Sequence, residues 1–277
     1  MRGPGLALFK RGRKPMQVFA YLIISLLASI AGAICGIGGG VIIKPTLDLF
    51  HLDSVATVSF LSGCTVLAMS CYSVTKAMRA GDSKVDLKIG TPLAIGAAIG
   101  GVAGKQMFSV ISAQFQETAG AVQAACLFLI TLGTMVYTLR KARIRTKQID
   151  SAVVCLIIGL LLGIMSSFLG IGGGPINLVV FYFFFSMDTK TAAQNSLYVI
   201  LVSQITSLLA TLVTGSVPPF GWLSLVLMVG GGIGGGMIGR AFNKRMDNKA
   251  VDKLFIGLMV VIMGISLYNV YQYTFAV

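Results

Sequence analysis

Gly36-Ile37-Gly38-Gly39-Gly40 is a stretch that recurs as Gly170-Ile171-Gly172-Gly173-Gly174, and this repeat decides the fold. Each copy follows an apolar run, at residues 17–35 and 151–169, that is long enough to span a membrane. Glycine in a helix interior costs about 1 kcal/mol relative to alanine, so each stretch predicts unwound backbone at membrane depth. Such backbone is tolerated only where protein buries it or where it lines a watery cavity. Glycine-broken apolar segments in matching positions of two halves are a sequence sign of a transporter's binding site.

The composition is that of an all-α polytopic membrane protein. Of the 277 residues, 56% are apolar and 11% are charged, whereas a soluble domain carries about 25% charged residues. Lysine and arginine number 22 against 9 acidic residues. Most of these cations flank the apolar runs, in clusters at residues 2–14, 76–88, 140–147 and 240–253. This placement predicts anchors at the surface of a lipid bilayer and argues against nucleic acid as a partner.

The sequence predicts two tandem repeats in a single membrane domain. Residues 100–105 match residues 235–240, each a Gly-Gly-x-x-Gly run closed by a cation, and residues 56–59 match residues 193–196. One gapped duplication explains why glycine stretch, polar patch and closing cation keep their order in both halves. The predicted organisation is a cationic N-terminal segment (1–16), a first repeat (17–139), a cationic linker (140–150) and a second repeat (151–273).

Each repeat is expected to hold about four membrane-spanning helices and one short re-entrant or half-helix segment. A continuous helix over residues 17–50 would be about 51 Å long and would overshoot the membrane. Eight crossings place the N-terminus and the first three cationic clusters on one side, which is expected to be cytoplasmic; the fourth cluster then lies outside. Ten crossings with inverted repeats are the alternative. The expected location is the cell inner membrane, with the N-terminus in the cytoplasm.

The candidate site is built for an anion. The predicted spans hold no acidic residue at their centres, which disfavours a cation carrier. Each glycine stretch opens a short helix, whose free N–H groups and dipole favour negative charge, and neutral polar side chains near by would complete the site. The predicted substrate-binding residues are Gly36, Gly38, Gly39, Gly40, Thr57, Ser59, Gly170, Gly172, Gly173, Gly174, Asn177, Gln194, Asn195 and Ser196.

Three cations and two glycine rows carry further expectations. Lys44 either holds the anion or extends its amine to the membrane interface. Lys105 and Arg240, which match across the repeats, are expected to anchor helix ends, with anion steering as the alternative. The glycines at 96, 100 and 104 and at 231, 235 and 239 predict faces for close helix packing. The sequence contains no metal-ligand cluster, Ser/His/Asp constellation or nucleotide-binding loop. We therefore expect no metal, no cofactor and no enzyme.

These motifs resemble those of the sulfite exporter TauE/SafE-like family of membrane anion permeases. The likeness rests on residues 36–40 with Pro45 and on residues 170–174 continued by 193–197, and it extends from about residue 20 to 272. It implies that the substrates are sulfite, thiosulfate, sulfoacetate, other organosulfonates or related small organic anions, moved by secondary transport with protons as a candidate coupling ion. Pro175 follows its glycines at once, earlier than Pro45 does, and departs from the first motif.

The function expected from the sequence is therefore alternating-access transport of a small anion, with one repeat rocking against the other. A passive channel for small anions or solutes is the alternative, and a membrane scaffold is a third hypothesis that leaves the repeated glycine stretches unexplained. The anion, the direction of transport and the oligomeric state do not follow from the sequence.

Overall fold

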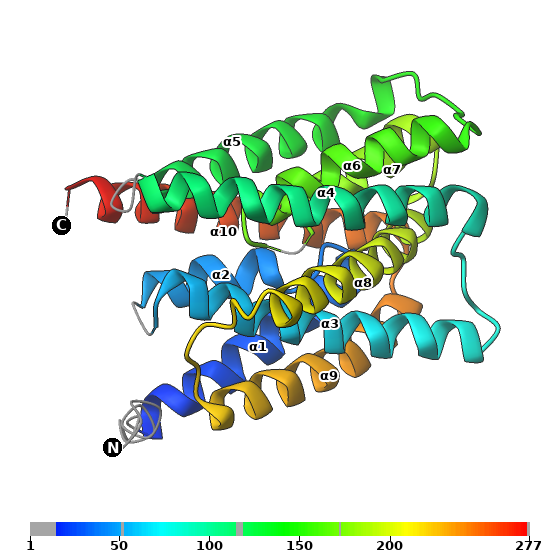
Figure 1. The fold of residues 1–277 in the computed structure, drawn as a ribbon. Coiled ribbons are helices and arrows are strands. Elements are labelled where there is room, and N and C mark those ends of the chain that lie inside the picture. Colours follow the sequence, from blue (N-terminus) through cyan, green and yellow to red (C-terminus); the bar gives the residue numbers. More distant parts are fainter. Residues whose placement is uncertain (1–14, 51–52, 115–118, 172, 276–277) are drawn as a thin grey trace, which may run out of the picture.

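A computed structural model describes residues 15–50, 53–114, 119–171 and 173–275. These residues form ten α-helices and one short 3-10 helix, η2 (Figure 1). The helices of the first half are α1 (Pro15–Cys35), α2 (Gly40–Leu49), α3 (Val55–Arg79), α4 (Leu87–Gln114) and α5 (Ala119–Arg140), and η2 (Lys141–Arg143) follows them. Those of the second half are α6 (Ala152–Phe168), α7 (Pro175–Phe185), α8 (Thr189–Val213), α9 (Trp222–Arg245) and α10 (Asn248–Phe275). The expected all-helical membrane fold is confirmed.

Within these described ranges, six helices are long and apolar enough to cross a membrane: α3, α4, α5, α8, α9 and α10. The two remaining pairs, α1–α2 and α6–α7, each form a hairpin that turns inside the molecule at a glycine stretch (Figure 1). Each half is therefore one hairpin followed by three long helices. The short helices α2 and α7 are the half-helix segments expected from the sequence.

The two halves are inverted relative to each other. Gly63 of α3 faces Gln204, late in α8. Ser73, later in α3, shares a pocket with Leu197, which comes earlier in α8. The matching helices α3 and α8 are thus antiparallel, and the α1–α2 and α6–α7 hairpins enter from opposite ends (Figure 1). The parallel arrangement with eight crossings, preferred from the sequence, is not the one seen, because an odd number of long helices per half reverses the direction of the second half.

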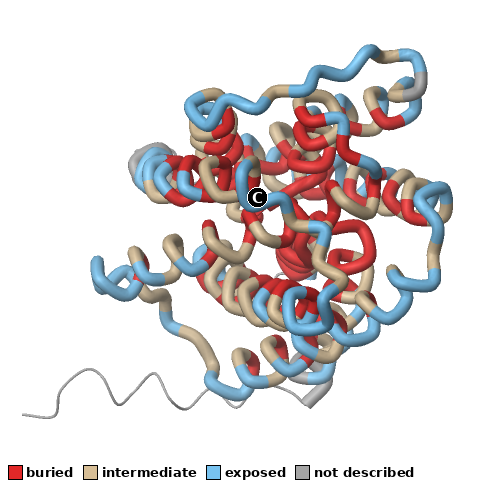
Figure 2. Tube along the Cα trace, turned by 90° about the vertical axis from the view of Figure 1, so that its right-hand side faces the viewer, coloured by how far each residue is buried: buried red, intermediate tan, exposed pale blue. Residues whose placement is uncertain are grey.

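Helices of one half pack mainly on helices of the other. The most extensive contacts join α4 to α6 and α1 to α9, and α9 also packs on α3 as α4 does on α8. Two rows result, α1–α9–α3 and α6–α4–α8, which meet where α3 contacts α8. The α5–α10 pair packs against the short helices, α10 on α2 and α5 on α7. Figure 2 shows buried residues gathered in the middle of this assembly and exposed ones around its rim.

The glycine rows make the two main contacts close, as the sequence predicted. A Cβ atom on Gly100 of α4 would lie 2.0 Å from the carbonyl oxygen of Leu160 in α6. One on Gly235 of α9 would lie 2.5 Å from the Cβ of Ser29 in α1. Only glycine allows these backbones to approach so closely.

Three of the four cationic clusters lie at one end of the molecule, which we call the basic end. It carries the loop at residues 80–86, the linker after α5, and the turns that follow α7 and α9 (right-hand side of Figure 1). The opposite end carries the α8–α9 loop, the start of α1 and the end of α10. The fourth cluster, residues 2–14, lies outside the described residues.

Candidate functional site

The two glycine stretches meet in the interior. A Cβ atom on Gly40 would lie 2.3 Å from the carbonyl oxygen of Ile171, and one on Gly173 would lie 3.7 Å from that of Ile37. Gly36 has φ +75°, and a Cβ there would lie 2.3 Å from the Cα of Ala193 in α8. Glycine is therefore required both for the left-handed turn and for the close approach of the two halves.

The short helices α2 and α7 both begin at this contact. Their N-cap residues are Gly39 and Gly174, and among the described residues no side chain caps either start. Pro175 occupies the first turn of α7, where its missing N–H is not needed, whereas Pro45 lies inside α2. Each of the two uncapped helix starts presents free N–H groups and the positive end of a helix dipole to this contact.

A cavity of about 350 Å³ lies at the opposite end, between α3 and α8. Its polar lining consists of hydroxyl and amide groups with a single cation, Lys105 at the end of the Gly-Gly-x-x-Gly run of α4. The Lys105 amine contacts the hydroxyl of Thr211. The predicted site residues Ser59 and Gly170 line this cavity together with Gln123, Ser167, Gln204 and Ser207.

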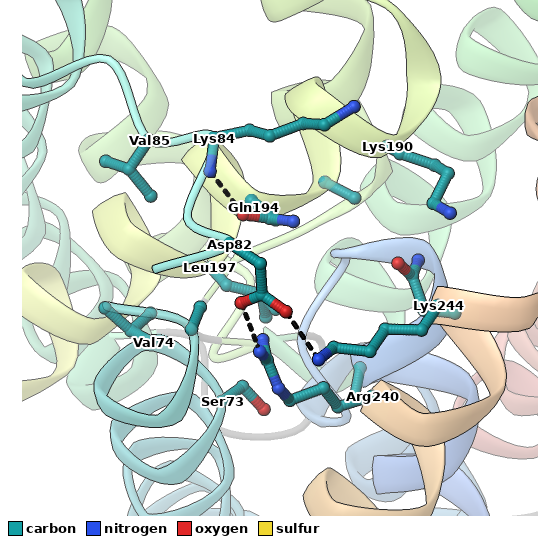
Figure 3. Close-up of a pocket in the computed structure, with 14 residues that line it drawn as sticks. Ser73, Val74, Asp82, Lys84, Val85, Lys190, Gln194, Leu197, Arg240 and Lys244 are labelled. Atoms are coloured by element: carbon teal, nitrogen blue, oxygen red, sulfur yellow. Dashed lines mark hydrogen bonds and ion pairs between the residues drawn. The ribbon is translucent and has the colours of Figure 1, made fainter. Parts of the chain in front are cut away.

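A second cavity, of about 190 Å³, lies at the basic end between the same two helices. Arg240, the repeat counterpart of Lys105, lines it together with Lys84, Lys190 and Lys244. The carboxylate of Asp82 accepts hydrogen bonds from Arg240 Nη2 and Lys244 Nζ, each at 2.5 Å (Figure 3). The hydrogen bonds from Lys244 and Arg240 hold the pKa of Asp82 below its usual value.

Buried apolar side chains lie between the two cavities. On α3, Gly63 lines the cavity at the opposite end and Ser73 lines the cavity at the basic end. Val66 lies between these two residues. Along α8 Ile200 occupies the matching position. Val66 is 0% exposed and Ile200 is 1% exposed, and a Cβ atom on Gly38 would lie 3.3 Å from the Ile200 side chain. The glycine contact and these two side chains thus separate two cavities that open toward opposite ends.

The predicted polar residues do not form one cluster. Gln194 lines the cavity at the basic end, and its Oε1 accepts a hydrogen bond from the backbone N–H of Lys84 at 2.7 Å. Asn195 donates to the carbonyl oxygens of Lys84 and Thr191 and accepts from the N–H of Asp86. Its amide fastens the loop at 80–86 and lines neither large cavity.

Three further predicted residues also make internal contacts. Thr57 donates to the carbonyl oxygen of Pro219 at 3.0 Å, so it fastens the α8–α9 loop at the opposite end, as Asn195 fastens the α3–α4 loop at the basic end. Asn177 donates to Ser196 Oγ at 3.4 Å, and both side chains are buried. Gly172 lies outside the described residues.

Lys44 is buried beside the second glycine stretch. Its side chain is 4% exposed, and its amine donates to Gln123 Oε1 at 2.6 Å and to the carbonyl oxygen of Leu169 at 3.0 Å. Gln123 in turn donates to the carbonyl oxygen of Phe168 at 2.6 Å. The amine therefore does not extend to the membrane interface: it stabilises the negative C-terminal end of α6.

Sequence reasoning missed the charged groups of the cavity at the basic end. Asp82, Lys84, Lys190 and Lys244 were not predicted as site residues, because each reads as a membrane-flanking charge. The available signal was the repeat match of Lys105 with Arg240, which places one cation in each cavity. Within the part of the chain that the structure describes, no group of three or more His, Cys, Asp or Glu side chains could hold a metal ion.

Inverted halves, broken helices at their contact and cavities toward both ends define a multi-pass membrane protein of the transporter class. The chain belongs to the sulfite exporter TauE/SafE family, whose model matches residues 21–267. This is the family that the glycine stretches indicated.

Two curated relatives carry transporter names. The probable membrane transporter protein YunE of Bacillus subtilis (strain 168) is 26% identical over 277 residues, which cover 91% of this chain and 97% of the relative. The probable membrane transporter protein YdhB of the same organism is 26% identical over 251 residues, covering 89% of this chain and 98% of the relative. No solved structure matches the chain significantly.

Proposed function

We propose that the protein is a secondary transporter of small anions that works by alternating access, with sulfite, thiosulfate, sulfoacetate or another organosulfonate as substrate. One observation carries the proposal. Two cavities related by the inverted repeat open toward opposite ends, and each contains the cation that closes a Gly-Gly-x-x-Gly run. The uncapped starts of α2 and α7 lie between them. An anion that enters either cavity therefore meets a cation, and the helix starts lie further in, behind Val66 and Ile200.

The lining of the cavities supports a small anion with an apolar part. The cavity at the opposite end offers one amine, Lys105, among hydroxyl, amide and apolar groups. Such a lining suits an organosulfonate, whose charged head needs hydrogen-bond donors while its carbon chain contacts apolar surface. Protons are the coupling ion to test, as the resemblance to the TauE/SafE family implies.

We further propose that the protein lies in the inner membrane with the basic end in the cytoplasm. Three cationic clusters gather at that end, and positively charged loops stay on the cytoplasmic side. Helix α1 begins at the opposite end, so this orientation reverses the expectation of a cytoplasmic N-terminus.

Transport by purified protein in liposomes tests the proposal. We expect saturable uptake of labelled sulfoacetate or thiosulfate, and faster uptake when the same anion is preloaded on the far side. Lys105→Gln and Arg240→Gln should each lower the ratio of kcat to KM roughly tenfold, the size of a lost charge-assisted hydrogen bond. Arg245→Gln removes an exposed cation from the same end of α9 and should transport normally.

Two outcomes would contradict the proposal. Flux that rises linearly with concentration and shows no counterflow would identify the passive channel instead. Uptake of a cation or a neutral solute, with no sulfur-containing or carboxylate anion transported, would exclude an anion site.

A further inference from the structure

Asp82 places a carboxylate inside the cavity at the basic end. One of its oxygens is bound by Arg240 and the other by Lys244, both on α9 (Figure 3). Asp82 itself belongs to the loop at residues 80–86 between α3 and α4, which we call the strap. The arrangement is that of a two-cation site with an oxyanion in place, and here the protein supplies the oxyanion.

The charges around this carboxylate favour an anionic ligand. Lys84 and Lys190 line the same cavity, and Asp82 is the only acidic residue in the lining. The Arg240 side chain is 13% exposed, and that of Asp82 is 36% exposed. Arg240 is thus held inside the cavity, while Asp82 reaches it from the more exposed side. When Asp82 leaves, four cationic side chains remain with no carboxylate in the lining.

The rest of the strap is fastened by neutral hydrogen bonds. The N–H groups of Lys84 and Asp86 donate to Gln194 and Asn195 of α8, and Asn195 donates back to the carbonyl oxygen of Lys84. The matching loop at the opposite end is fastened by Thr57 to Pro219, and none of the ion pairs between described residues involves it. Among the described residues, only the loop at the basic end is therefore held by an ion pair, that of Asp82 with Arg240 and Lys244.

We propose that Asp82 is an internal competitor for the substrate: an anion that enters at the basic end replaces its carboxylate between Arg240 and Lys244 and so releases the strap. The inference rests on the proposed function and adds how one end of the pathway opens. Carboxylates, sulfonates and sulfite all offer two oxygens that can accept the same two hydrogen bonds. Exchange of one anion for another leaves both cations paired, so the strap is released while Arg240, whose side chain is 13% exposed, keeps an anionic partner.

The charge state of Asp82 keeps this contact intact at neutral pH. Arg240, Lys244, Lys84 and Lys190 all line the cavity with it, and its pKa lies below the usual value of 3.8. A carboxylate with a lowered pKa contributes stability above its unfolded-state pKa and loses it as the pH falls through the folded-state value. A pH change between 6 and 8 therefore leaves the Asp82 carboxylate charged and does not by itself release the strap.

The Asp82→Asn variant tests the inference, because the amide cannot accept charge-assisted hydrogen bonds from both cations. We expect it to bind at least one anion among sulfoacetate, thiosulfate, sulfite and acetate roughly tenfold more tightly than the wild type in calorimetry. Hydrogen exchange at residues 80–86 should be faster in this variant without ligand, and faster in the wild type once that anion is added. Asp86→Asn, on the same strap, keeps the oxygen that accepts from the N–H of Lys88 and should match the wild type.

Each result separates this inference from the proposed function. Equal or weaker binding of all four anions by Asp82→Asn would overturn the inference, even if the wild type transports one of them. Tighter binding that disappears in the Asp82→Asn, Arg240→Gln double variant would support it. Such binding together with no anion transport by the wild type would leave the two-cation site standing and reject the proposed function.

Discussion

Lys44 shows what a single residue contributes to this fold. Its amine connects α2 of the first half to the end of α6 in the second half through the carbonyl oxygen of Leu169 and the amide of Gln123. The repeat counterpart at an offset of 134 is Leu178, so this contact exists on one side only. The sequence allowed the amine either to hold an anion or to reach the interface. It could not reveal the third possibility, because Leu169 and Gln123 lie far away along the chain.

We expect Lys44→Met to lower the melting temperature in detergent. The substitution keeps an unbranched side chain, shorter by one atom, but leaves two buried oxygen atoms without a donor, at a cost of about 1–3 kcal/mol. Lys76→Met removes an exposed cation near the end of α3 and should change stability little. Because Gln123 belongs to the same network, combining Lys44→Met with Gln123→Leu should cost less than the sum of the two single losses. Additive losses would mean that the two side chains act independently.

Asn195 marks the limit of sequence reasoning for the site. A polar side chain at membrane depth either lines a pathway or pairs with another group, and the sequence favoured the pathway. In the structure its amide bonds three backbone groups, two of them in the strap more than a hundred residues earlier. Ser59, Gly170 and Gln194 do line cavities. Residue type thus predicted that these side chains are polar and lie at membrane depth. Which of them line a cavity and which hold a loop in place depended on tertiary contacts.

At the scale of helices, the glycine rows were the most predictable feature. Their spacing of four residues places them on one helix face, and that face is where α4 and α9 approach their partners. The partners were not predictable, because small-residue spacing specifies close contact but not which helix makes it. The direction of the halves was missed for a related reason: short apolar segments after each glycine stretch fit a re-entrant helix and a crossing equally well.

We expect Gly100→Ala to weaken the α4–α6 contact severely. The added Cβ would lie 2.0 Å from the carbonyl oxygen of Leu160, so the two backbones must separate and lose packing along the row. Overpacking of this kind costs about 1–3 kcal/mol or more, and the yield of monodisperse protein should fall with the melting temperature. Gly257→Ala in α10, where nothing lies within 4 Å of the new Cβ, should be neutral or slightly stabilising. Equal behaviour of the two variants would contradict the close contact.

At the scale of the whole molecule, the sequence halves are not the rigid units. Helix α9 of the second half packs between α1 and α3 of the first, and α4 packs between α6 and α8 in the same way. Rocking one half against the other, as the sequence suggested, would separate α4 from α6 and α1 from α9, the two glycine-lined contacts. Motion of the row α1–α9–α3 against the row α6–α4–α8 keeps both glycine-lined contacts intact. It changes the contacts between the rows, which are the α3–α8 contact beside the two cavities and the approach of Gly36 to Ala193 of α8.

The proposed orientation of the molecule gives a prediction for intact cells. A cysteine introduced at Ser216, on the exposed α8–α9 loop at the opposite end, should react with a membrane-impermeant maleimide from outside. One introduced at Arg143, exposed in η2 at the basic end, should react only after the membrane is opened. The chain without either substitution sets the background from its native cysteines. If the cysteine at position 143 reacted from outside and the one at position 216 did not, the basic end would lie outside. The N-terminus would then be cytoplasmic, as expected from the sequence.

The exchange of helices between the halves also affects how the chain is made. Helix α1 ends at Cys35, but its main partner α9 ends at Arg245, so about 210 residues are synthesised in between. At 5–20 residues per second, α1 resides in the membrane without that partner for on the order of ten to forty seconds. Its serines face the future contact, and the Ser25 hydroxyl bonds the carbonyl oxygen of Leu22 in its own helix. That bond satisfies a polar group which lipid would otherwise leave unpaired until α9 arrives.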